Sequence, residues 1–170
     1  MTFSATVSDA QESASALSLE WSIDGVVFST QGATSAGIAQ FTDNSLSYGQ
    51  RELRLTATDN SGLSNDDLIT ITINGLPSEP TVSIVPTPAY TDDDITVSAT
   101  NSVDPEGNPV TFTYDWYLNG VSSGQTGTTI GNTLTTKGDE WSVYVTPSDG
   151  ISTGTTGSAI VQRTEPQSRA

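Results

Sequence analysis

The sequence contains no cysteine and no histidine, and Lys137 is its one lysine among 170 residues. A chain without these residue types cannot form disulfides, cannot build the usual zinc sites, and lacks the Ser-His and Cys-His pairs of many hydrolases. No apolar run approaches the roughly 20 residues that cross a membrane. Residues 1–5 have neither the basic start nor the apolar core of a secretion signal. We therefore expect a protein that is not an enzyme and does not insert into membranes.

Positive charge is also scarce. Five Lys and Arg face 20 Asp and Glu, which gives a formal net charge of -15. Such a surface repels phosphate backbones and anionic lipids, so we expect no nucleic-acid partner. A polar surface made of Ser, Thr, Asn, Gly and acidic residues suits an extracellular or cell-surface protein.

The chain contains an internal repeat. Leu17-Ser-Leu-Glu-Trp-Ser-Ile-Asp-Gly25 and Phe112-Thr-Tyr-Asp-Trp-Tyr-Leu-Asn-Gly120 share alternating apolar residues, a Trp, and a Gly four residues after the Trp. A second pair of segments, Leu53–Asp59 and Val143–Asp149, repeats in the same order. The sequence therefore predicts two tandem copies of one small domain.

Both copies show the period-two alternation of β-strands, and Gly, Asn, Asp and Ser separate the strands as in all-β sandwiches. We expect no helix longer than two turns. The predicted strands of copy 1 cover residues 2–8, 17–23, 26–29, 38–42, 51–58 and 67–74. Those of copy 2 cover residues 81–85, 94–100, 110–118, 127–134, 141–147 and 155–162.

These patterns predict the domain boundaries. We assign residues 1–75 to domain 1, residues 76–80 to a short linker stiffened by two prolines, and residues 81–163 to domain 2. Residues 164–170 form a tail or begin a further linker. Copy 2 opens with Pro80-Thr-Val-Ser-Ile-Val-Pro86, whose counterpart in copy 1 would precede Met1. We therefore expect domain 1 to lack its first strand and the chain to be part of a longer polypeptide.

Three segments carry a resemblance to a known family. Val103-Asp-Pro-Glu-Gly-Asn-Pro109 precedes the Trp116 strand, and Leu55–Gly62 and Val145–Gly150 close the two copies. Together they resemble the polycystic-kidney-disease (PKD) and immunoglobulin-like repeats of bacterial and archaeal surface or secreted proteins. The sequence departs from the PKD pattern after the Trp, where that family has Trp-Asp-Phe-Gly-Asp-Gly. The resemblance implies an all-β chain of two tandem immunoglobulin-like (PKD- or cadherin-like) antiparallel β-sandwiches.

Strand parity predicts which side chains are buried. Trp21 and Trp116 share parity with neighbouring apolar residues, so we expect both Trp side chains in the cores. Aligning the two copies places Glu20 opposite Arg54 on the solvent face of copy 1, as an exposed pair.

The acidic loops are the candidate metal site. Calcium takes six to eight oxygen ligands from carboxylates, carbonyls and Asn side chains. Asp104 and Glu106 lie on one short loop, and the repeat places Asp149 at the same end of the sandwich, near Glu79 of the linker. We expect these four acids to bind calcium at the hinge between the domains. The alternative is that they are ordinary solvated loop residues, as we expect for the turn at residues 92–94.

A second candidate site lies on a sheet face. Tyr117 and Tyr144 have the opposite parity to the core residues and should lie diagonally across two strands beside Asp115. Flat aromatic rings beside a carboxylate could bind a sugar ring. The alternative is that both tyrosines are simply good strand formers.

The predicted function is a non-catalytic structural or adhesive spacer within a larger extracellular or cell-surface protein, with calcium as its one candidate cofactor. One alternative is a carbohydrate-binding accessory module of a secreted enzyme. Another is a subunit of an extracellular filament or virion decoration, in which a neighbouring chain supplies the missing strand. The expected partners are neighbouring domains of the same parent chain, surface polysaccharide, or further copies of the chain.

Overall fold

The computed structural model describes residues 1–165 and divides into two units, the first spanning Met1–Ile73 and the second beginning at Asn74. Both units are built from β-strands, and the helical segments are two three-residue 3-10 turns, Ala14–Ala16 and Asn132–Leu134. No helix in this part of the chain is long and apolar enough to cross a membrane. The all-β prediction is confirmed.

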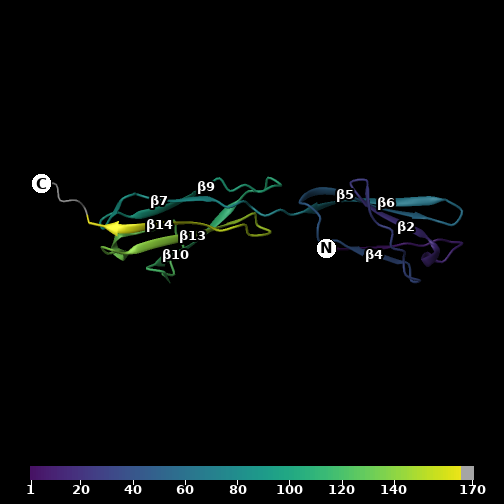
Figure 1. Cartoon of the computed structure of the whole chain (residues 1–170), viewed down its shortest axis with the longest axis horizontal. Helices are drawn as coiled ribbons and strands as arrows, with labels where there is room; N and C mark the ends of the chain where they lie inside the picture. Colours follow the sequence, from purple (N-terminus) through teal and green to yellow (C-terminus); the bar gives the residue numbers. More distant parts are fainter. Residues whose placement is uncertain (166–170) are drawn as a thin grey trace. The chain divides into compact units, whose positions relative to one another are not determined.

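Unit 2 is a sandwich of two sheets, visible as two layers of strands in Figure 1. The first sheet has the order β12 (Thr129–Ile130), β9 (Ile95–Thr100), β7 (Thr81–Val85). The second has the order β11 (Val121–Ser122), β10 (Thr111–Leu118), β13 (Glu140–Ser148), β14 (Gly157–Thr164), β8 (Ala89–Tyr90). Strands far apart in sequence are neighbours in both sheets, as in the fibronectin and immunoglobulin sandwiches. Unit 2 is an immunoglobulin-like sandwich.

The chain changes sheets between β7 and β8. Strand β7 pairs antiparallel with β9, whereas β8 pairs parallel with β14. Pro86 and Pro88 lie between them, and proline has no backbone N–H for a sheet ladder. The ladder with β9 therefore stops, and the next residues are free to join the other sheet.

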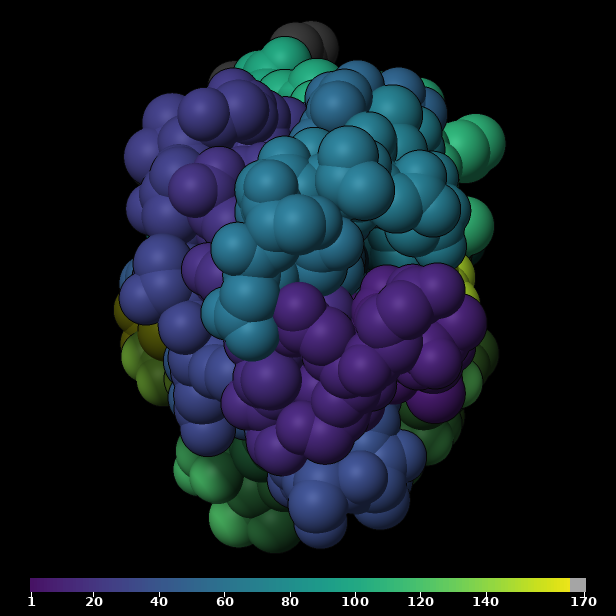
Figure 2. Space-filling model, turned by 90° about the vertical axis from the view of Figure 1, so that its right-hand side faces the viewer, coloured from purple at the N-terminus to yellow at the C-terminus, as the bar shows by residue number. Residues whose placement is uncertain are grey.

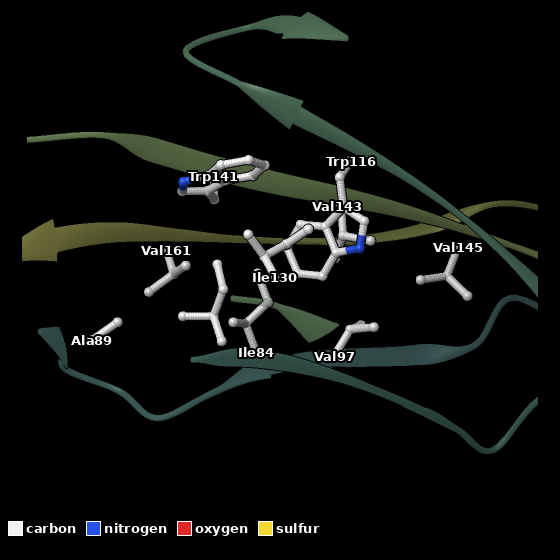
Figure 3. Close-up of a cluster of buried hydrophobic side chains, with 10 residues drawn as sticks. Ile84, Ala89, Val97, Trp116, Ile130, Trp141, Val143, Val145 and Val161 are labelled. Carbon is white, nitrogen blue, oxygen red and sulfur yellow. The ribbon is translucent and has the colours of Figure 1, made fainter. Parts of the chain in front are cut away.

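Side chains from both sheets of unit 2 fill the space between them (Figure 3). Trp116 is 1% exposed, and its indole Nε1–H donates to the Gly127 carbonyl at 2.8 Å. Its ring lies edge-on to Trp141, with ring centroids 6.2 Å apart. The predicted burial of Trp116 is confirmed.

Unit 1 has a related but smaller strand set. One sheet has the order β3 (Val26–Ser29), β2 (Ser18–Ile23), β5 (Gly49–Thr58), β6 (Ser64–Ile73). The other pairs β1 (Thr2–Thr6) with β4 (Ile38–Thr42). Strand β1 corresponds to β9, because Ser4-Ala-Thr6 repeats Ser98-Ala-Thr100. In the described part of unit 1, no strand pairs with the second edge of β1, where β7 pairs with β9 in unit 2.

The core of unit 1 is aromatic. Trp21 is 3% exposed and lies 5.0 Å from Phe41, measured between ring centroids. Phe41 in turn stacks on Phe3 at 4.9 Å. The predicted burial of Trp21 is confirmed.

One predicted strand is shorter than expected. Of residues 127–134, only Thr129–Ile130 form a strand, and Asn132–Leu134 form a 3-10 turn. The turn is held from another part of the chain, because the Asn132 N–H donates to Asp94 Oδ1 at 2.8 Å and its side-chain amide donates to the Asp92 carbonyl. The two-residue strands β8 and β11 are too short to leave an alternating pattern in the sequence.

The predicted pairing of Glu20 with Arg54 is wrong by two residues. Glu20 lies opposite Thr56, and Arg54 lies opposite Ser22. Trp21 pairs with Leu55, whereas Trp116 pairs with Val143, so the two units differ in register by two residues relative to the sequence alignment. A shift of two leaves every side chain on the same face, so alternation cannot reveal it.

Arg54 forms its ion pairs elsewhere, with Asp66 at 3.0 Å and Glu52 at 3.8 Å. Its side chain is 44% exposed, as is that of Asp66. Because exposed ion pairs contribute little, Arg54→Ala should lower the stability of unit 1 by less than about 1 kcal/mol in a thermal melt. A drop of many degrees in the melting temperature would show that the Arg54–Asp66 ion pair stabilises unit 1 more than an exposed ion pair can.

Candidate functional site in the acidic loops of unit 2

Asp104 shapes the loop that follows β9. The side chain is 5% exposed, and its Oδ1 accepts hydrogen bonds from the N–H groups of Glu106, at 3.1 Å, and Asn108, at 2.9 Å. Gly107 has a φ of 82°, a conformation that glycine adopts without strain. Asp104 therefore holds a tight turn that positions Glu106.

Glu106 and Asp149 both bind the chain segment that opens unit 2. The Gly75 N–H donates to Glu106 Oε2 at 2.8 Å, and the Asn74 side-chain amide donates to Asp149 Oδ2 at 2.8 Å. A Cβ at Gly75 would lie 2.8 Å from Pro105 Cγ, so the backbone can approach the loop only because position 75 is glycine. The two acids hold residues 74–75 against the end of the sandwich.

Ser78 continues this attachment. Its N–H donates to the Val103 carbonyl at 2.9 Å, and the Val103 N–H donates to Ser78 Oγ at 2.9 Å. The Ser102 hydroxyl donates to the Ser78 carbonyl. Residues 74–78 are thus fastened to unit 2 by backbone and side-chain hydrogen bonds, although the sequence predicts part of this stretch as a linker.

Two carboxylate oxygens in this site have no partner. Asp104 Oδ2 and Glu106 Oε1 are buried and accept no hydrogen bond in the described structure. A buried acceptor without a donor is costly, so both atoms are suited to a cation or to an ordered water. Among residues 1–165, however, no three acidic side chains are arranged so that they could hold a metal ion.

The four acids of the predicted calcium site therefore differ in their surroundings. Asp104 and Glu106 share one loop, and Asp149 reaches the same segment through Asn74. The second oxygen of Asp149, Oδ1, accepts from the N–H groups of Ile151 at 2.7 Å and Ser152 at 2.6 Å. Glu79 is exposed. Calcium binding stays a prediction, with Asp104 and Glu106 as the pair that has free oxygens.

The equivalent acids of unit 1 are bonded within that unit. Asp9 Oδ1 accepts from the N–H groups of Gln11 and Glu12, at 2.7 and 2.8 Å, as Asp104 does in its own loop. Glu12 accepts from both the backbone N–H and the side-chain amide of Asn60. In Figure 2 the loop after β1, in purple, accordingly lies against the turn between β5 and β6, in teal.

The local hydrogen bonds lower the pKa of Asp149. The first cause is the Ser152 backbone N–H, and the second is the Asn74 side-chain amide. A carboxyl whose pKa is lower in the folded state stabilises the fold above its unfolded pKa, and this contribution disappears as the pH falls through the folded pKa. Asp149 therefore stabilises unit 2 at neutral pH and loses this effect in acid.

We expect Asp149→Asn to make the melting temperature of unit 2 less dependent on pH between about pH 5 and pH 2. The measurement is a series of calorimetric melts on the intact chain. Asp92→Asn, on an exposed turn, is the matched control for the change in net charge. An unchanged profile in Asp149→Asn would exclude this contribution.

The tyrosines of the predicted sugar site lie diagonally across two strands, with Tyr144 opposite Asp115 and Tyr117 opposite Ser142, two pairs further along. The two rings pack edge to face at 77°, with centroids 5.3 Å apart. Tyr144 is 46% exposed. A pair of perpendicular rings offers no continuous flat surface, and the contact itself stabilises the sheet. Sugar binding stays a prediction with weaker geometric support than the acidic loops.

Arg163 is a buried charged residue that is not among the predicted site residues. Arg163 is 1% exposed, and its Nη2 donates to Thr135 Oγ1 at 2.8 Å and to the Asp93 carbonyl. Its parity with Val161 places it on the inward face of β14, which was the signal available in the sequence. Asp93 also accepts from the Tyr90 N–H, so residues 92–94 form the expected turn.

Several solved structures are similar to this chain in fold, at low sequence identity. No family model and no curated protein matches the chain. Fibronectin(III)-like modules of Clostridium thermocellum CbhA align with all of it at 18% identity, covering 88% of that structure, with a TM-score of 0.38. A two-domain fibronectin type III segment of chicken tenascin aligns with 95% of it at 12% identity, covering 91% of that segment, with a TM-score of 0.41.

A third similar structure comes from a 1.5-MDa bacterial ice-binding adhesin. It aligns with 96% of the chain at 15% identity and a TM-score of 0.48, and the chain spans 57% of that structure. At such identities and scores these likenesses support no functional conclusion. The assignment of both units as immunoglobulin-like sandwiches rests on their own strand order.

Proposed function

We propose that this chain is a non-catalytic structural or adhesive segment of a larger extracellular or cell-surface protein. Two sandwiches in tandem give length, and an acidic surface limits non-specific association. The neighbours expected on either side are further domains of the same polypeptide. We also propose that the chain is related to the PKD-like repeats of bacterial and archaeal proteins, because the Asp104 loop and the Trp116 strand resemble segments of those repeats.

The attachment of residues 74–78 is the observation that carries this proposal. A spacer transmits force along its backbone, so the segment that enters a domain must not peel away from it. In unit 2 Glu106 and Ser78 fasten this segment at the Asp104 loop. Near the other end of the unit, β8 pairs parallel with β14 through Ala89 and Arg163. A pull on the two ends of unit 2 would load these parallel strands along their length, so that their hydrogen bonds resist together.

Single-molecule pulling on the intact chain tests this role. The expected record has two separate unfolding steps, each releasing roughly 250–350 Å of chain at up to 3.6 Å per residue. Extension without a force peak would show that neither sandwich bears load and would exclude the spacer function.

We further propose that unit 2 binds calcium at the Asp104 loop. Asp104 Oδ2 and Glu106 Oε1 are buried oxygens without partners, and a divalent cation beside them would remove this cost. Carbonyl groups and water would have to supply the remaining ligands, since calcium takes six to eight oxygens. The cation would stabilise unit 2 because it binds only the folded loop.

We expect calcium at a hundredfold excess over its Kd to stabilise unit 2 by about 2.7 kcal/mol in calorimetry, relative to a chelator. Asp104→Asn should abolish this difference, whereas Asp92→Asn should keep it. Identical melts in calcium and chelator, with no heat of binding down to millimolar affinity, would falsify the site. Asp104 and Glu106 would then act only as hydrogen-bond acceptors for their loop and for Gly75.

A further inference from the structure

The outward face of β10, β13 and β14 in unit 2 places one small residue among four larger ones. Ser142 lies opposite Tyr117 on one side and opposite Ile160 on the other. Along β13 it is flanked by Glu140 and Tyr144, which point to the same face because strand side chains alternate. We refer to these five residues as the tyrosine patch.

Two sides of the tyrosine patch are aromatic and one is aliphatic. The rings of Tyr117 and Tyr144 stand at 77° to each other, with centroids 5.3 Å apart, so together they form a corner. Tyr144 is 46% exposed and Ile160 is 63% exposed, which leaves both side chains open to a ligand. Aromatic faces attract cations, and two perpendicular rings can contact one rounded cation from two directions. A flat sugar ring would not fit such a corner equally well.

The remaining side of the tyrosine patch is acidic. Glu140 is exposed, and the exposed Asp115 lies next to the patch, opposite Tyr144. None of the ion pairs among residues 1–165 includes Glu140 or Asp115. The formal net charge of -15 attracts cations to the chain as a whole. The two carboxylates therefore favour a positively charged ligand.

Unit 1 has a cation of its own at the corresponding place. The residue that follows its repeated Trp, Ser22, lies opposite Arg54. In unit 2 the residue in the place of Arg54 is Ser142. Arg54 pairs at 3.8 Å with Glu52, two residues before it, and Glu140 likewise lies two residues before Ser142. Unit 2 thus keeps the carboxylate of this arrangement but has serine where unit 1 has the guanidinium.

We propose that the tyrosine patch binds an alkylammonium cation, an ammonium group that carries methyl or methylene groups. The ammonium group lies in the corner between Tyr117 and Tyr144, and its alkyl groups contact Ile160. Glu140 and Asp115 balance its charge. A choline headgroup and the side chain of a lysine both have this chemistry. The proposal does not rest on the spacer function, because a spacer needs no ligand on this face.

NMR titrations of the intact chain at constant ionic strength test the proposal. The probes are choline and its uncharged isostere, in which a carbon atom replaces the nitrogen. We expect choline to cause saturable shifts of the amide signals of Tyr117, Ser142 and Tyr144 at millimolar concentrations. The uncharged isostere should bind at least about fivefold more weakly, because it loses the attraction to both rings and to the carboxylates.

Variants of the chain assign the shifts to the tyrosine patch. Tyr144→Ala should weaken choline binding by about two- to fivefold, whereas Tyr48→Ala, at an exposed tyrosine of unit 1, is the matched control and should not change it. Ser142→Arg should abolish binding, because its guanidinium would occupy the corner itself. Ser83→Arg, on the exposed face of the other sheet, makes the same change in charge and should keep binding. Thermal melts confirm that unit 2 is folded in each variant.

Two peptides distinguish the sources of the cation, one with a lysine and one with a trimethyllysine between glycines. Tighter binding of a peptide than of choline would assign the tyrosine patch to a protein partner, and equal or weaker binding would show that the ammonium group alone is recognised. Both outcomes support the proposal.

Three results would overturn the proposal. One is the absence of saturable shifts with choline and with both peptides, and another is equal binding of choline and its uncharged isostere. The third is choline binding that Ser142→Arg leaves unchanged. A neutral oligosaccharide that binds the patch when the ammonium probes do not would assign Tyr117 and Tyr144 to a sugar instead.

Discussion

Trp116→Ala should lower the stability of unit 2 by about 3–5 kcal/mol, the largest effect expected for a single substitution in this chain. The ring is 1% exposed and lies between the two sheets, so its removal leaves a cavity and also deprives the Gly127 carbonyl of its donor. For a domain of this size the melting temperature should fall by more than about 10 °C. Calorimetry of the intact chain measures this directly.

The same experiment tests whether the two cores are separate. Trp21→Ala should lower a different transition, that of unit 1, and leave the transition of unit 2 in place. Tyr144→Ala, on the exposed face of β13, is the surface control; it removes only the ring contact with Tyr117 and should lower the transition of unit 2 much less than Trp116→Ala. If Trp116→Ala shifted both transitions equally, the two units would not fold as independent sandwiches.

Arg163→Ala should destabilise unit 2 by about 2–4 kcal/mol. The side chain is 1% exposed, and its loss would leave a cavity and remove the donor to Thr135 Oγ1 and the Asp93 carbonyl. Because Thr135 is itself buried, water cannot readily replace that donor. Calorimetry of unit 2 in the intact chain gives the value.

Arg163→Met is the matched variant. It keeps most of the buried stem and removes a charge that no ion pair among the described residues neutralises. Burying an unpaired charge is unfavourable, so the methionine variant should be clearly more stable than the alanine variant. Equal losses in the two variants would show that the hydrogen bonds of Arg163, rather than its packing, determine the effect.

Much of the fold could be predicted from alternation and the internal repeat. Strict period-two patterns around Trp21 and Trp116 give the strands, the inward faces and the two cores, because the inward positions of these two strands are apolar. Register was not predictable in the same way. Trp21 pairs with Leu55, whereas Trp116 pairs with Val143, so the strand pairing of the two units differs by two residues relative to the sequence alignment. A difference of two residues keeps every side chain on the same face of its sheet, so the alternating pattern is the same for both registers.

The candidate site was predictable only in part. The sequence placed Asp104, Glu106 and Asp149 at one end of a sandwich, since loops that follow alternate strands meet there. It could not show that Glu106 accepts from the Gly75 N–H, because backbone groups have no signature in a sequence.

The acidic loops of unit 2 hold residues 74–78 as part of the fold. Hydrogen exchange of the backbone amides, followed by NMR on the intact chain, tests it most directly. The N–H groups of Gly75 and Ser78 should be protected, and Glu106→Gln should lower the protection of Gly75 more than that of Ser78. Exchange of both amides at the rate of an unstructured peptide would contradict the claim and make this segment a free tether.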